Sequence, residues 1–171
     1  MLLRCPRGPT DRTPDIARIE YFNDPSAPSP NSIVVAVTAF VRDERRRVLL
    51  IRRTDNDLWA LPGGAQDFGE FVAETVVRET LEETGIRVEV TGLVGVYSNP
   101  RHVIAYSNGE VRQQFSLCFR ARPVTGELTP SAESSEVRWV DLSELDPLAI
   151  HPSMRLRIDH GYENRTEPYI G

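Results

Sequence analysis

Residues 71–84 constrain the fold more than any other segment, because they have the pattern of an amphipathic helix with an unusual polar face. On a helical projection, one side carries Val72, Ala73, Val76, Val77, Thr80 and Leu81. The opposite side carries Thr75, Glu79, Glu82 and Glu83. Gly85 follows directly and is suited to end the helix in the left-handed conformation. The carboxylates repel one another and lie in the last turn, where the helix dipole disfavours negative charge, so the pattern predicts a bound cation.

The loop before this helix reads LPGGAQDFGE at residues 61–70, and its glycines let backbone groups approach a ligand closely. Loop and helix together offer carboxylate and carbonyl oxygens, with no His or Cys. Such hard ligands suit Mg²⁺, with Mn²⁺ as the alternative, rather than zinc. Because Mg²⁺ is usually held by one or two carboxylates together with substrate phosphates, we expect a phosphate-bearing substrate.

Residues 64–86, GAQDFGEFVAETVVRETLEETGI, resemble the Nudix box, a motif written G-x5-E-x7-R-E-U-x-E-E-x-G-U in which U is aliphatic. The matching positions are Gly64, Glu70, Arg78, Glu79, Glu82, Glu83, Gly85 and Ile86. Thr80 departs from the pattern at the first aliphatic position. Because it falls on the apolar face, its hydroxyl needs a partner, and we expect a hydrogen bond back to the Val76 carbonyl.

The resemblance also implies roles for the matching residues. The implied metal ligands are Glu79 and Glu83, with contributions from Glu82 and the carbonyl of Gly64. Glu70 and Arg78 would pair and hold the loop against the helix. Members of the family hydrolyse a nucleoside diphosphate linked to another group, X, through attack of an activated water on a pyrophosphate phosphorus. The resemblance therefore implies a Mg²⁺-dependent pyrophosphohydrolase.

The general base is open between two glutamates. In SAESSEVRW, residues 131–139, Glu133 lies in a loop just before a strand, where some relatives place a base, and it is the first choice as base or extra metal ligand. Glu82, inside the box, is the alternative. Glu136 adjoins the strand and is interpreted as a structural or solvated edge charge. Geometry decides, because a base must lie within about 2.6–3.2 Å of the attacking water.

Substrate contacts outside the box are expected from arginines. Arg53 ends a strand just before the loop, where relatives often place an arginine that contacts phosphate. Arg101 and His102 could reach a phosphate or base from a loop, although a lone loop histidine is more often solvated. Trp59 is interpreted as a packing anchor rather than a platform for a base. Pro100 lies near the spacing typical of ADP-ribose pyrophosphatases of this family, without matching it.

ADP-ribose or a nucleotide sugar is therefore slightly favoured as the substrate. The alternative within the family is an (oxidised) nucleoside triphosphate, as for MutT-type enzymes. An alternative of another class is a Nudix-fold sensor that binds a nucleotide without cleaving it. Such sensors usually lack box carboxylates or carry a DNA-binding domain, whereas this sequence keeps all the acids.

The rest of the chain predicts one α/β (α+β) domain of the Nudix type, an α/β/α sandwich around a mixed sheet. Residues 1–31 are Pro-rich and are interpreted as an arm, with a short strand in IARIEYF, before a hydrolase domain at 32–171. Residues 33–41 and 48–53 are expected to form a hairpin. Further expected strands are 87–99, 110–124 and 137–140, and a helix is expected from His151, with Pro152 in its first turn.

The net charge of −5 argues against nucleic acid or an anionic membrane surface as a partner. No apolar run is long enough for a signal peptide or a membrane span, so a cytoplasmic location is expected. The expected partner is a small nucleoside diphosphate derivative. A homodimer is plausible from family habit only.

Overall fold

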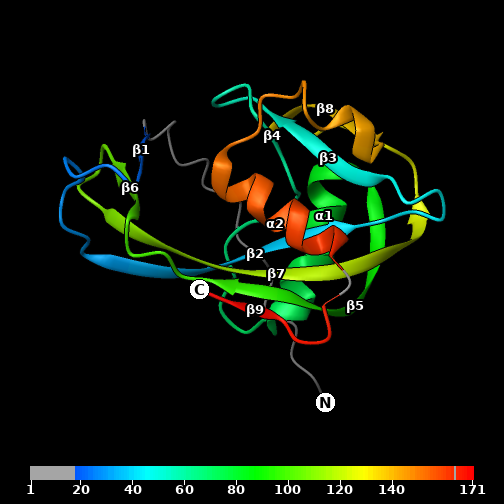
Figure 1. Ribbon diagram of the computed structural model, residues 1–171, viewed down its shortest axis with the longest axis horizontal. Helices are drawn as coiled ribbons and strands as arrows, with labels where there is room; N and C mark the ends of the chain where they lie inside the picture. Colours follow the sequence, from blue (N-terminus) through cyan, green and yellow to red (C-terminus); the bar gives the residue numbers. More distant parts are fainter. Residues whose placement is uncertain (1–17, 164) are drawn as a thin grey trace, which may run out of the picture.

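A computed structural model describes residues 18–163 and 165–171 and contains two β-sheets and two α-helices (Figure 1). The larger sheet is built on the long strand β7, which pairs in parallel with β2 along one edge and antiparallel with β6 and β5 along the other. Strand β1 extends the sheet beyond β6, and the short β9 extends it beyond β5. The bounds are β1 Arg18–Phe22, β2 Ser32–Val41, β5 Ile86–Tyr97, β6 His102–Tyr106, β7 Val111–Gly126 and β9 Tyr169–Ile170.

The smaller sheet is antiparallel, with β3 (Val48–Arg53) between β4 (Trp59–Ala60) and β8 (Ser134–Val140). The predicted hairpin of β2 with β3 is therefore wrong. The two strands belong to different sheets, and a single isolated bridge, Arg42 with Val48, joins their facing ends. The reason is competition for partners, because β2 gives ten residues to a parallel ladder with β7 while β3 pairs with β8.

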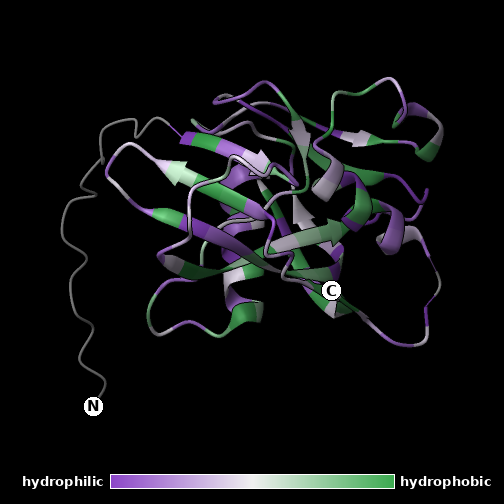
Figure 2. Cartoon of the chain, turned by 60° about the vertical axis from the view of Figure 1, so that its left-hand side comes forward, coloured by the Kyte–Doolittle hydropathy of each residue, from purple (hydrophilic) through white to green (hydrophobic). Residues whose placement is uncertain are grey.

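The two α-helices pack against opposite faces of β2. Successive side chains of a strand point to opposite faces, so Val37 and Val41 share a core with Val76 of α1 (Val72–Thr84), whereas Phe40 packs with Ile158 of α2 (Pro152–Tyr162). Hydrophobic positions recur within the strands and are interrupted by hydrophilic ones in Figure 2. A 3₁₀ turn, η1 (Leu142–Glu144), precedes α2. The prediction of a mixed sheet flanked by helices is confirmed.

Helix α1 is rotated relative to its predicted burial. Val76 and Thr80 are fully buried as expected, but Leu81 is 41% exposed, whereas Glu83 is only 4% exposed. The loop before the helix covers the side that carries Glu83, so that side counts as interior. The predicted bond from Thr80 to the Val76 carbonyl is also wrong, because the Thr80 hydroxyl has no hydrogen-bond partner among the described residues.

Gly85 ends α1 as predicted. Its φ of 74° lies in the left-handed region, and its N–H donates to the Leu81 carbonyl at 2.9 Å. The strand begins at the next residue, so this stop fixes the carboxylates of the last helical turn close to the start of β5.

Three short strands escaped prediction: β4 in the expected loop after β3, β6 in the expected connection between β5 and β7, and β9 near the C-terminal end. The strand expected in IARIEYF is present as β1. Residues 1–17 of the arm lie outside the described part of the chain. Within that described part, no helix is long and apolar enough to cross a membrane.

Candidate active site

Arg78 ties the loop to helix α1. Its Nε donates to Glu70 Oε1 at 2.7 Å and one terminal nitrogen donates to Glu70 Oε2 at 3.0 Å, which makes a bidentate pair. The same nitrogen reaches the Ala65 carbonyl at 3.2 Å, and Thr75 Oγ1 donates to Glu70 at 2.9 Å. These bonds, with Arg78 first, hold the pKa of Glu70 down at about 2. The structure thus places Glu70 and Arg78 as a clamp beneath the loop.

Glu83 is buried beside the loop and is held by its backbone. The Gly63 N–H donates to Glu83 Oε2 at 2.7 Å. Burial raises the pKa of Glu83 to about 7; the Gly63 bond opposes the rise, and the nearby charges of Glu79 and Glu133 add to it. A carboxyl group in this condition gains from a neighbouring cation, which would favour its ionised form.

Glu79 lies directly above the backbone of Gly64. A Cβ built on Gly64 would lie 2.5 Å from the carboxyl carbon of Glu79, so only glycine leaves room for this approach. Burial also raises the pKa of Glu79, although Arg78 donates to it at 2.8 Å and lowers it. The Gly64 carbonyl accepts the Val37 N–H at 2.8 Å and keeps a second lone pair for another partner.

The box carboxylates have the chemistry that suits a divalent cation, although their oxygens do not point to one common position in the structure. All are oxygen donors, and the ionisation of Glu79 and Glu83 is opposed by burial. In the structure Arg78 holds Glu79 and also Glu82, the latter at 3.3 Å, and Glu82 itself is exposed. A metal cation that binds Glu79 and Glu82 would therefore compete with the guanidinium of Arg78.

Glu133 and Arg53 line a cavity of about 360 Å³ together with Gly64 and Glu79. Glu133 is exposed, and its carboxylate makes no hydrogen bond within residues 18–163 and 165–171, whereas its charge raises the pKa of both Glu79 and Glu83. Arg53 forms two bonds with Asp55, each 2.9 Å long, through two of its five N–H groups. Within residues 18–163 and 165–171, its remaining donors have no hydrogen-bond partner and could bind a phosphate.

The other predicted residues take different places. Arg101 does not line this cavity but lines a neighbouring one of about 370 Å³. His102 begins β6 and is buried rather than solvated. Trp59 lines the cavity and belongs to the core, and the guanidinium carbon of Arg138 lies over its ring at 4.8 Å from the ring centre. Glu136 lies on β8 opposite Arg52, as an edge charge would.

Sequence reasoning missed a polar wall of the cavity that comes from β1, β6 and the start of α2. Glu20, His102 and His151 each offer an atom that could bind a metal, and these atoms all lie within 4.8 Å of one another. No other group of this kind is found in the described part of the chain. Glu20 Oε1 lies 2.6 Å from His102 Nε2 and 3.6 Å from His151 Nε2. No local motif marks these residues, since they stand in segments far apart in sequence and only the tertiary fold joins them.

This wall is better explained as a hydrogen-bonded network than as a metal site. The Ser153 N–H donates to His151 Nδ1 at 3.2 Å, so the neutral ring carries its proton on Nε2, the atom that faces Glu20. Burial lowers the pKa of His151, which favours this neutral form. Glu20 is hydrogen-bonded to the His102 ring and lies 3.6 Å from Nε2 of the His151 ring, and Phe22 packs edge-on against both rings.

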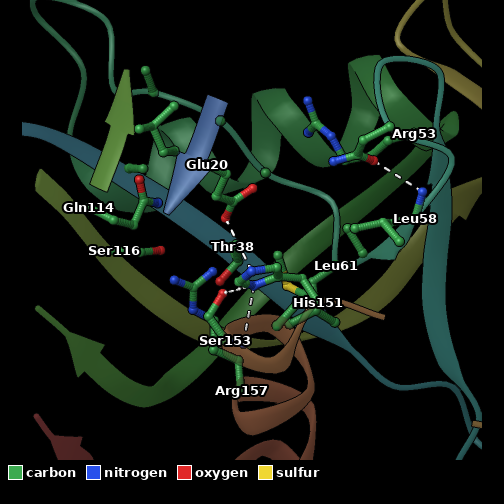
Figure 3. A pocket seen from close by; sticks show the side chains of 18 of the residues that line it. Glu20, Thr38, Arg53, Leu58, Leu61, Gln114, Ser116, His151, Ser153 and Arg157 are labelled. Carbon is green, nitrogen blue, oxygen red and sulfur yellow. Dashed lines mark hydrogen bonds and ion pairs between the residues drawn. The ribbon is translucent and has the colours of Figure 1, made fainter. Parts of the chain in front are cut away.

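In Figure 3, Arg53 lies at one side of the cavity and Gln114, Ser116 and Arg157 lie at the other. Glu20 and His151 are seen between them. The cavity thus connects the charged groups of the box to a second polar region on β7 and α2, where a long substrate could extend.

Comparison with known proteins agrees with this architecture. The family model of the NUDIX domain matches residues 33–160. A MutT-like protein of Streptomyces ambofaciens is 40% identical over 126 residues, which cover 73% of this chain and 75% of that protein. An ADP-ribose pyrophosphatase of Methanocaldococcus jannaschii is 37% identical over 123 residues, covering 67% of this chain and 66% of that protein.

Among solved structures, a NUDIX hydrolase from Nitrosomonas europaea superposes with a TM-score of 0.69 at 26% identity, over 82% of this chain and 78% of that one. The matches in sequence and in fold place the chain in this class of hydrolases. The chain belongs to the Nudix hydrolase family. Its activity is accordingly that of a hydrolase acting on nucleoside diphosphate derivatives.

Proposed function

We propose that this protein is a Mg²⁺-dependent pyrophosphohydrolase that cleaves the diphosphate linkage of a nucleoside diphosphate derivative, with ADP-ribose or a nucleotide sugar favoured. The observation that carries the proposal is the shared cavity, which Gly64, Glu79, Arg53 and Glu133 all line. Acids that gain from a cation and an arginine with free donors thus meet around one space. Mn²⁺ is the alternative cation.

Glu79, Glu83 and the Gly64 carbonyl would hold the cation, with Glu82 contributing after release from Arg78. When bound, the cation supplies charge neutralisation to the phosphates and acidifies the attacking water. The clamp of Arg78 and Glu70 keeps loop and helix in register, so the ligands need little rearrangement.

Glu133 accepts the proton of the attacking water as general base. It suits this role because its carboxylate is exposed to the cavity and free of hydrogen bonds among the described residues, whereas Glu82 is occupied by Arg78. Arg53 binds a phosphate oxygen and stabilises the charge that develops there. Glu82 is the reserve for the base.

The similarity to an ADP-ribose pyrophosphatase supports the favoured substrate. A second candidate is an (oxidised) nucleoside triphosphate, which the 40% identity to a MutT-like protein favours. A sensor without catalysis is the candidate of another class, and the complete set of box acids argues against it. The cytoplasmic location and a homodimer remain predictions.

The test is a hydrolysis assay with Mg²⁺ over ADP-ribose, nucleotide sugars, dinucleotides and deoxynucleoside triphosphates, on the wild type and Glu83→Gln. We expect turnover of at least one nucleoside diphosphate derivative, and a loss of at least about 10²-fold in the variant. Tight binding of a nucleotide with no turnover of any substrate would establish the sensor instead. Full activity in Glu83→Gln would overturn the metal assignment.

A further inference from the structure

Helix α2 carries a buried arginine into the cavity. Arg157 is 3% exposed, and neither an ion pair nor a hydrogen bond reaches its guanidinium from residues 18–163 and 165–171. The ring of Tyr97 lies 5.2 Å from its central carbon. Such a cation–π contact offsets only part of the free energy needed to remove a guanidinium from water. A buried cation of this kind needs an anion, and the described protein does not supply one.

The other arginines of the same cavity are all paired. Arg18 and Arg53 both bind Asp55, at 3.0 and 2.9 Å. Arg112 binds Glu110 at 3.0 Å. Glu20, an acid of the cavity, is hydrogen-bonded to His102 at 2.6 Å instead of to Arg157. Within the described cavity wall, Arg157 is therefore the arginine that has no acidic partner from the protein.

The groups around Arg157 suit an oxyanion. Ser116 is fully buried, and its hydroxyl lacks a hydrogen-bond partner within the described part of the chain, as does the hydroxyl of Thr38. Both lie on neighbouring strands, β7 and β2, and Gln114 adds an amide two residues along β7. Figure 3 shows these side chains and the guanidinium at the same side of the cavity. A guanidinium with hydroxyl and amide donors is the set that proteins use for phosphate and carboxylate groups.

We propose that Arg157 binds an acidic group of the substrate, a phosphate or a carboxylate that is additional to the diphosphate being cleaved. The inference rests on the proposed function, because the same cavity runs from Glu79 of the box to Arg157. The preferred substrates are then nucleoside diphosphate derivatives with an extra negative charge, on the nucleoside or on X. Neutral counterparts leave the guanidinium unpaired in the complex.

Matched substrate pairs test this preference. UDP-glucuronate differs from UDP-glucose by a carboxylate, and ADP-ribose 2′-phosphate differs from ADP-ribose by a phosphate. We expect the wild type to show a kcat/KM at least about tenfold higher for the acidic member of one pair, and Arg157→Met to reduce that ratio to about one. The ratio between the two members carries the test, and a circular dichroism spectrum like that of the wild type shows that the variant is folded. The pair that responds identifies the acidic group.

Arg138→Met is the matched control. Arg138 also has a buried Nε without a described partner and also lies over an aromatic ring, that of Trp59, but it does not line the cavity. The control should keep the preference of the wild type. An equal loss on both members of a pair in Arg157→Met, or no preference in the wild type for either acidic member, would overturn the proposal.

Binding without turnover separates this inference from the proposed function. If the wild type hydrolyses none of these compounds, the proposed function fails, and the anion site is then tested by calorimetric titration with inorganic phosphate and with glucuronate. Saturable binding that disappears in Arg157→Met and persists in Arg138→Met would support the site. Absence of binding in the wild type, or binding that survives Arg157→Met, would refute it.

Discussion

The two ends of the cavity handle their polar groups in opposite ways. At the box end, defined by Glu70, Arg78, Glu79, Glu82 and Glu83, each acid has a hydrogen-bond partner from the protein. At the Arg157 end, defined by Thr38, Gln114, Ser116 and Arg157, the buried hydroxyls and the guanidinium find none among the described residues.

This difference suits the two ends to two different tasks, catalysis at the box end and substrate recognition at the Arg157 end. Chemistry needs ligands that are held in place before the substrate arrives, and the internal bonds of the box end provide this order. Recognition needs groups that gain more from a ligand than from the protein, and unsatisfied donors have that property.

The largest effect is expected at Glu133, the acid of the cavity whose carboxylate makes no hydrogen bond within the described residues. Glu133→Gln should lower kcat by about 10²–10⁴-fold, the usual contribution of a general base, and leave Tm unchanged because the side chain is exposed. Glu136→Gln, three residues further on and opposite Arg52, is the control and should keep the wild-type rate. An unchanged kcat in Glu133→Gln would move the base to Glu82.

The close approach of Gly64 to Glu79 can be broken by one methyl group. In Gly64→Ala the new Cβ would lie 2.5 Å from the Glu79 carboxyl carbon, so the carboxylate must move. A displacement of this order can lower the rate about 10²-fold. Gly92→Ala, whose Cβ would meet no atom within 4 Å, is the control. Steady-state kinetics at saturating Mg²⁺ decide, and equal rates in the two variants would show that the approach has no function.

The clamp itself is tested by Arg78→Gln. Without the guanidinium, Glu70 loses its bidentate partner and its pKa should rise from about 2 toward the ordinary value of 4.5. Loss of such a supporting residue typically lowers metal affinity by about 10–100-fold, so the Mg²⁺ concentration for half-maximal rate should rise by that factor. Arg87→Gln, exposed on β5, should leave the Mg²⁺ dependence as it is. An unchanged Mg²⁺ dependence in Arg78→Gln would show that Arg78 does not position the metal ligands of the box end.

A pH titration of stability tests the strain at the box end without any substrate. Because the folded protein raises the pKa of Glu83 from 4.5 to about 7, it binds the proton more tightly than the unfolded chain. The free energy of unfolding should therefore fall as the pH rises from about 4.5 to 7. Metal-free Glu83→Gln should melt several degrees above the wild type at pH 8, since each kcal/mol shifts Tm by about 2–4 °C, and the gap should close below about pH 4.5.

The exposed Glu82 provides the comparison for this titration. Glu82→Gln should follow the wild-type dependence of Tm on pH. A gap at pH 8 that does not shrink on acidification would assign the stabilisation to something other than the charge of Glu83.

The smallest effect concerns a hydroxyl that is unsatisfied but faces no ligand. Thr80 lies in the core of α1, so Thr80→Val removes a buried group without a described partner and should raise Tm by about 2–4 °C with no change in kcat/KM. Ser116→Ala should also raise Tm, yet it should weaken the preference for acidic substrates. A loss of activity in Thr80→Val would contradict this distinction.

The box end was largely predictable because its residues lie in one continuous segment. The helical period predicts α1, the conformational freedom of glycine predicts the stop at Gly85, and the repulsion of like charges predicts a cation. The rotation of the helix was not predictable, because it depends on the loop that covers Glu83. Pairing of β2 with β7 rather than β3 likewise depends on tertiary competition, which local pattern does not contain.

The Arg157 end escaped sequence reasoning for a related reason. Its residues come from β2, β7 and α2, and no short motif joins them. One signal was available, since Arg157 is three residues after Met154 and adjacent to the buried Ile158, so it falls near the inner face of its helix. A charged residue on the inner face of a helix is a candidate for contact with a ligand.

Strand β1 has a consequence for the order in which the box end and the polar wall of Glu20, His102 and His151 form. Phe22 pairs with His102, so the wall that carries Glu20 closes only when segments some eighty residues apart meet, whereas Gly63 and Glu83 are separated by 20 residues. Long-range closure loses more chain entropy and is slower. Hydrogen exchange during refolding should protect α1 before β1. The box end should thus be ordered while the polar wall is still open.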